Sequence, residues 1–207
     1  MQLKKFMEEN YKGLTLSPDF YHNWETGIHI ELGNDNHQNY EKHNLPRFHI
    51  EYKQVSEILA LLFKKTDDVI VVVNSYPDET KNTVHPNFFK RYVKNQKKKY
   101  SLLLQEYTWL FDEDKISVQQ MELYCKTLDI KLELLLKTCI HEDFLSQNPR
   151  LKRKHSIYAP DVFLVNTNTK CIFHLYDDSG CEILNTDMEF HNELLDYFKE
   201  WNILSKP

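Results

Sequence analysis

Two adjacent carboxylates near the end of the chain have the residue types needed for acid–base or metal chemistry. Asp177 and Asp178 follow an apolar stretch that contains His174. A carboxylate pair can bind a divalent cation or transfer protons, and a nearby histidine can act as the base. Glu31, which lies between two apolar residues of an earlier segment, is a further carboxylate of this kind. No catalytic residue is assigned, and the candidates are Glu31, His174, Asp177 and Asp178.

Each candidate also has a structural interpretation, which we favour. The residues from Asp177 to Gly180 are typical of a turn, because an Asp side chain accepts a backbone N–H two residues on and glycine supplies a positive φ. Metal ligands must converge, whereas consecutive residues in a hairpin point apart. Glu31 is expected to face outward or lie at a sheet edge, and His174 is expected to be a hydrogen-bonded sheet histidine.

The other motifs that would indicate a reaction or a cofactor are missing from the sequence. The ten histidines never occur as H-x-x-x-H or H-E-x-x-H, and the four cysteines form no C-x-x-C pair, so we predict no metal site. The four glycines are too far apart for a dinucleotide or P-loop motif, and no G-x-S-x-G is present. We therefore expect no cofactor, and we expect reduced thiols inside the fold.

Composition predicts an ordinary soluble, cytoplasmic protein that folds as one domain over residues 1–207. Hydrophobic residues make up 41% of the chain, while the longest apolar runs are far shorter than the ~20 residues of a membrane helix. We therefore expect no membrane association. The net charge of −5 makes a nucleic-acid partner improbable, and the basic segments 90–99 and 150–154 fit solvated surfaces better than a phosphate-binding site.

Hydrophobic periodicity predicts an α+β fold: a mainly antiparallel sheet with flanking helices, and a C-terminal hairpin and meander followed by a helix. The last helix is expected to be capped by Thr186-x-x-Glu189, and the segment 69–74 is expected to be a central strand buried on both faces. Helices are expected at about 2–11, from 48 to the break at 67–68, at 87–98, at 132–140 and after 186. Strands are expected at about 26–32, 69–74, 100–111, 118–128, 161–166, 171–176 and 181–184.

Three segments carry a resemblance to a known family. The sequence Ile172-Phe-His-Leu-Tyr-Asp-Asp-Ser-Gly-Cys181 resembles the Tyr-Asp-Asp-Arg-Gly signature of the bacterial domain of unknown function 3885, and the segments 24–33 and 69–76 resemble earlier parts of the same family. The resemblance spans about 20–201, with its signature hairpin at 161–184. The signature arginine is Ser179 here, and the Arg-Phe-Glu-Leu strand of the family is His-Ile-Glu-Leu from His29. Since the family has no assigned activity, the resemblance implies none.

Two classes of function remain. The first is a non-catalytic protein-binding module, such as a toxin-immunity-type protein, whose partner is a toxin or a neighbouring gene product. Aromatic residues are enriched at interface hot spots, and Trp24, Tyr76 and Trp109 are the candidate binding residues. The alternative is a small hydrolase or nucleic-acid-acting enzyme that uses the carboxylates Glu31, Asp177 and Asp178. The sequence leaves the oligomeric state open.

Overall fold

The computed structural model describes residues 2–18, 20–33, 45–76, 87–111, 114–151 and 158–205. Within these residues, eight strands form one sheet in the order β3-β4-β2-β5-β6-β7-β1-β8, and every neighbouring pair is antiparallel. The strands are β1 (Ile28–Glu31), β2 (Asp68–Ser75), β3 (Leu103–Phe111), β4 (Asp114–Lys126), β5 (Asp161–Asn166), β6 (Cys171–Leu175), β7 (Gly180–Leu184) and β8 (Ile203–Ser205).

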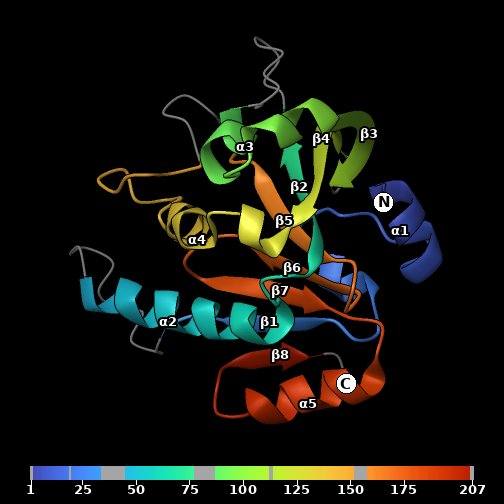
Figure 1. Cartoon of the computed structure of the whole chain (residues 1–207). Coiled ribbons are helices and arrows are strands. Elements are labelled where there is room, and N and C mark those ends of the chain that lie inside the picture. Colours follow the sequence, from blue (N-terminus) through green and yellow to red (C-terminus); the bar gives the residue numbers. More distant parts are fainter. Residues whose placement is uncertain are drawn as a thin grey trace.

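One face of the sheet carries the larger core. Alternate residues of β2, such as Val71, point to this face, where α2 contributes Val55, Ile58 and Leu62 on a helical spacing. Figure 1 shows α2 and α4 on the opposite side of the sheet from α1. The α-helices that pack on this core are α2 (Leu45–Leu62), α3 (Asn87–Tyr92), α4 (Leu132–Ile140) and α5 (Met188–Tyr197).

The N-terminal segment covers the opposite face. Helix α1 (Leu3–Asn10) and the short 3-10 helix η1 (Phe20–Asn23) pack a second core against the other alternation of the strands. Phe6 and Phe20 are fully buried there beside Val72 and Phe163. The backbone N–H of Leu3 donates to the Glu122 carboxylate on β4 at 3.0 Å, which fixes the start of α1 on the sheet.

Several predicted elements are confirmed. The fold is α+β with a mainly antiparallel sheet and flanking helices. Strand β2 lies between β4 and β5 and is buried on both faces, and β5 and β6 form the predicted hairpin. All four cysteines are free and buried; burial raises the pKa of the Cys171 thiol to about 11, so it stays protonated at neutral pH. Across the described ranges, no helix is both long and apolar enough to cross a membrane.

The basic helix predicted at 87–98 is shorter in the structure. Helix α3 ends at Tyr92 because Val93 forms an antiparallel β-bridge with Ile130, which takes the backbone out of the helix. A separate 3-10 helix, η2 (Gln96–Ser101), begins after Asn95, whose side chain accepts the Lys97 N–H. A further 3-10 helix, η3 (Thr127–Asp129), follows β4.

The C-terminal region differs from the prediction in two ways. The cap of α5 is Asp187 and not Thr186, because the Asp187 carboxylate accepts the N–H groups of Glu189 and Phe190. After α5 the chain returns to the sheet as β8, a three-residue strand that pairs with β1 and that periodicity did not predict.

Candidate functional site

The Asp177–Gly180 segment forms a turn between β6 and β7. The Asp177 carboxylate accepts the backbone N–H of Ser179 at 2.6 Å, which is the hydrogen bond that the turn interpretation predicts. Burial raises the pKa of Asp177, and the neighbouring Asp178 adds to the increase by charge repulsion. The first role of Asp177 in this structure is therefore to close the turn.

The predicted positive φ at Gly180 is wrong. Among the described glycines, positive φ occurs at Gly13 and Gly33. Glycine is required at position 180 for space: a Cβ there would overlap the Tyr176 hydroxyl and lie 2.8 Å from the carbonyl oxygen of Ile30 on the neighbouring strand. The signature glycine therefore allows β1 and the Tyr176 ring to approach β7 closely.

His174 is buried on the face of the sheet that η1 covers. Its Nδ1 is 3.2 Å from the Glu182 carboxylate, and its Nε2 is 3.9 Å from the Asp161 carboxylate. The imidazole stacks on Phe163 with ring centroids 4.3 Å apart, and Phe20 of η1 packs over it. The His174 and Glu182 side chains are each only 2% exposed, so substrate access to this pair requires displacement of η1.

Sequence reasoning missed the carboxylate partners of His174. The sequence placed His174 near Asp177, whereas the structure pairs the imidazole with Glu182 and Asp161. The available signal was Glu182 itself, a charged residue within the apolar β7 segment, since buried charges are paired. Only the strand register, which aligns His174 with Glu182, identifies the pair.

A polar cluster surrounds Tyr176, which directly follows β6. The Tyr176 hydroxyl lies 3.3 Å from Nε2 of His29, and the two rings stack. Burial is the main cause that raises the Tyr176 pKa, followed by the charges of Asp177, Cys181, Glu182 and Glu31. The negative charges of two candidate carboxylates, Glu31 and Asp177, thus both raise the pKa of this hydroxyl.

Glu31 also has a structural partner, because its carboxylate accepts a hydrogen bond from the Asn202 side chain. Both departures from the family pattern, His29 and Ser179, lie in or next to the paired strands β1 and β7. His29 is aligned with Glu182, and Ser179 immediately precedes Gly180, the residue aligned with Glu31.

The three candidate binding aromatics occupy two places. Tyr76 and Trp109 lie together, with ring centroids 6.2 Å apart, and Tyr158 also packs on Tyr76, with ring centroids 5.8 Å apart. Trp24 lies elsewhere, because its indole N–H donates to the carbonyl oxygen of Asn185 and its ring packs on the buried Tyr11. Tyr76, Trp109 and the exposed Tyr158 thus form an aromatic group, and Trp24 supports the N-terminal segment.

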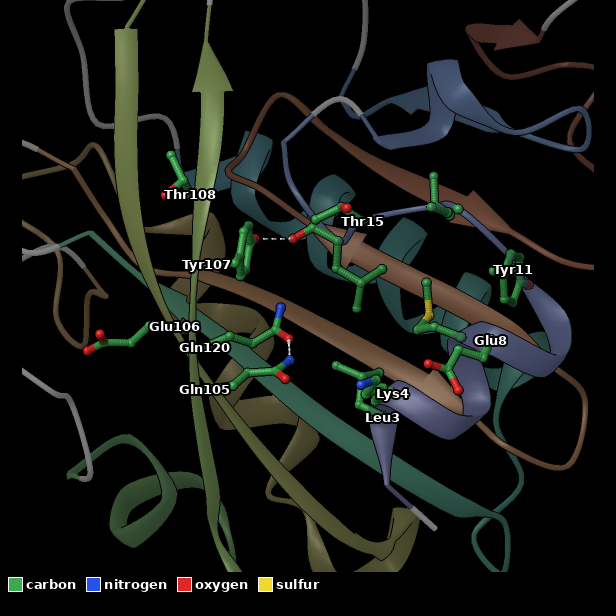
Figure 2. Close-up of a pocket in the computed structure, with 14 residues that line it drawn as sticks. Leu3, Lys4, Glu8, Tyr11, Thr15, Gln105, Glu106, Tyr107, Thr108 and Gln120 are labelled. Carbon is green, nitrogen blue, oxygen red and sulfur yellow. Dashed lines mark hydrogen bonds between the residues drawn. The ribbon is translucent and has the colours of Figure 1, made fainter.

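An open groove lies between α1 and the strands β3 and β4. We call it the α1–β3 groove; its volume is about 390 Å³. Figure 2 shows α1 along one side and the β3–β4 ribbon along the other. Leu3, Met7 and Leu14 line it from the N-terminal segment, while Gln105, Tyr107 and Gln120 line it from the strands. Sequence reasoning did not identify this groove.

A hydrogen-bonded row fixes the strand side of the groove. The Gln105 amide donates to Gln120, and Gln120 donates to Asn74 at 2.8 Å. The Asn74 amide and the Tyr107 hydroxyl both donate to the carbonyl oxygen of Leu16, each at 2.7 Å. The row joins three strands to the loop after α1, which favours a preformed groove. Figure 2 shows the Gln105–Gln120 part of this row.

Of the two basic segments, the first runs from the end of α3 into η2 and is mostly exposed. Lys94 donates to the carbonyl oxygen of Leu128, and Lys97 and Lys99 are exposed at the surface. In the second segment, Arg150 is described and residues 152–154 lie outside the described residues.

Comparison with known proteins shows to which family the chain belongs. The model of the family described as Domain of unknown function (DUF3885) matches residues 3–206. The chain belongs to this family. The match includes α1 and β8, so it extends beyond the expected span of about 20–201. The chain is also 34% identical over 208 residues to "Uncharacterized protein YnaE" of Bacillus subtilis (strain 168), with 97% of each chain covered. No solved structure matches the chain.

Proposed function

We propose that this DUF3885 protein is a non-catalytic protein-binding module that holds a partner protein at the α1–β3 groove. The observation that carries the proposal is the contrast between this groove and the acid–base residues. The groove is open and lined mainly by apolar and neutral polar side chains, with the charged residues Lys4, Glu8 and Glu106 also in its lining, whereas the His174–Glu182 pair is buried under η1. Protein-binding surfaces combine such apolar contacts with a few placed hydrogen-bonding groups.

The aromatic group supports the same function. Trp109 is on β3, the strand that also supplies Gln105 and Tyr107 to the groove. Large aromatic side chains dominate the energy of many protein interfaces. A partner that occupies the groove and continues along β3 reaches both features.

For the partner class, we propose a toxin or another neighbouring gene product, which makes the chain an immunity-type protein. Such a protein acts by occupying its partner and needs no reactive group of its own. The catalytic alternative requires carboxylates around an accessible reaction centre. Its candidates instead have local structural partners: Asp177 closes the turn, and Glu31 accepts from Asn202.

The test is co-expression of the chain with each neighbouring gene product, followed by purification and calorimetric titration of any complex. The variant Thr15→Arg places a long charged side chain at the exposed edge of the groove, and we expect it to weaken the complex at least tenfold. Thr186→Arg, at an exposed position before α5, is the matched control and should bind as wild type.

Two results would contradict the proposal. One is that no neighbouring product forms a stoichiometric complex. The other is a complex that Thr15→Arg and Thr186→Arg affect equally, because the partner would then bind elsewhere. An immunity role also predicts that cells producing a toxic partner survive only when the chain is co-produced.

A further inference from the structure

Among the strands that the structure describes, β3 forms one edge of the sheet, and its surface is unusual for an edge. Natural sheets protect long edges with proline, lysine or bulges, because unpaired backbone groups attract other strands. The nine residues of β3 contain neither proline nor lysine, and their register with β4 runs without interruption from Leu103 to Phe111. Figure 1 shows β3 at the outer end of the sheet.

The same strand exposes large apolar side chains. Leu103, Leu104 and Leu110 are 43%, 50% and 64% exposed, respectively. A long, regular edge with apolar side chains is the surface that takes up another strand. We propose that the chain forms a two-fold symmetric dimer in which β3 pairs antiparallel with β3 of a second copy.

The sequence of β3 is complementary to itself when the two-fold axis passes through Tyr107. In that register Leu104 lies opposite Leu110 of the second copy, Gln105 lies opposite Trp109, and Glu106 lies opposite Thr108. Apolar residues thus meet near both ends, and the charge of Glu106 meets a neutral residue. A two-fold axis through Glu106 would place two carboxylates opposite each other, which is unfavourable.

Charges beyond the strand favour the same arrangement. Lys97 and Lys99 lie in η2, just before β3, and both are exposed. Asp114, the last of three consecutive acidic residues in the sequence, is exposed just after β3 and is followed by a single exposed lysine, Lys115. Antiparallel pairing brings the start of one β3 to the end of the other, so the basic end of each copy meets the acidic end of its partner, twice by symmetry.

The dimer goes beyond the proposed function and does not depend on it. A two-fold axis between antiparallel strands is perpendicular to the sheet, so both α1–β3 grooves would open on the same side. The grooves then flank the new pair of β3 strands. Experiments can separate the two proposals. A dimer whose grooves bind no partner would support only the dimer, and a monomer that binds a partner in its groove would support only the proposed function.

The experiment measures the mass of the purified full chain by analytical ultracentrifugation over a range of concentrations. We expect a reversible dimer of twice 24.9 kDa. Thr108→Glu places one carboxylate opposite Glu106 of the other copy in each half of the dimer, and should weaken dimerisation by about tenfold. Thr108→Lys at the same exposed position places opposite charges together and should strengthen it.

Ser117→Glu is the matched control. Ser117 is exposed and is the β4 partner of Thr108, so it receives the same charge within the same hairpin but does not face the second copy. It should dimerise as wild type, and circular dichroism should show that all three variants are folded. A wild-type chain that stays monomeric, including one whose β3 binds a different protein, overturns the proposal. A dimer that responds alike to Thr108→Glu, Thr108→Lys and Ser117→Glu also overturns it.

Discussion

At the scale of single residues, the family signature acts mainly through shape and hydrogen bonding. Gly180 leaves room for the Tyr176 hydroxyl and for the carbonyl oxygen of Ile30, while Asp177 closes the turn through Ser179. Each role depends on the size or the hydrogen bonding of the signature residue and involves no chemical reaction. A stable packing site thus accounts for most of the motif.

The close packing around Gly180 predicts a specific effect on stability. Gly180→Ala should lower the free energy of unfolding by about 1–3 kcal/mol, because the added methyl group overlaps Tyr176 and crowds Ile30. Tyr176→Phe removes the overlapping hydroxyl, so the double variant should lose less stability than the sum of the single variants. Urea denaturation of the four proteins measures this coupling; additive losses would contradict the packing role.

At the scale of elements, local hydrogen bonds decide where helices begin and end. The segment before α5 offers Thr186 and Asp187 as alternative caps, and in the structure Asp187 accepts both free N–H groups. The same competition ends α3, where a β-bridge at Val93 replaces the helical continuation. Helix propensity alone does not decide between Thr186 and Asp187 as the cap, or between helix and β-bridge at Val93.

The choice of cap can be measured directly. Asp187→Ala should destabilise the protein by about 1 kcal/mol, because the N–H groups of Glu189 and Phe190 lose their acceptor. Thr186→Ala should change stability by less than ~0.5 kcal/mol, since its side chain is exposed. Thermal unfolding followed by circular dichroism compares the two. The reverse order would restore the cap that the sequence predicted.

At the scale of the whole molecule, one sheet separates two cores of unequal size. Helices α2 to α5 cover one face, and only the N-terminal segment with α1 and η1 forms the described cover of the other. The second core contains the buried rings of Phe6 and Phe20. The N-terminal segment is therefore an integral part of the fold and also forms one wall of the α1–β3 groove.

This architecture predicts that a change in α1 destabilises the entire protein. Phe6→Ala should cost about 3–5 kcal/mol, because Phe6 is 1% exposed and its removal leaves a cavity against the sheet. Leu145→Ala is the control, since Leu145 is 78% exposed, and it should cost less than ~0.5 kcal/mol. Chemical denaturation monitored at several wavelengths gives both values. A cost for Phe6→Ala as small as the control would mean that α1 is only loosely attached.

Much of this protein was predictable from its sequence alone. Period-two and helical spacing gave the α+β class, the buried strand β2 and the β5–β6 hairpin, because side-chain direction repeats locally along a strand or helix. The turn chemistry at Asp177 and the buried thiols were predictable for the same local reason. The family resemblance depended on short segments of this kind.

Tertiary structure decided what those local patterns leave open. The pairing of His174 with Glu182 and Asp161 depends on the order and register of β5, β6 and β7. The α1–β3 groove is formed by residues of the N-terminal segment and of β3 and β4, which are far apart in the sequence. Strand β8 is too short to give a periodic signal. Strand order and register are set by the summed packing of residues far apart in sequence, so only the folded chain brings these groups together.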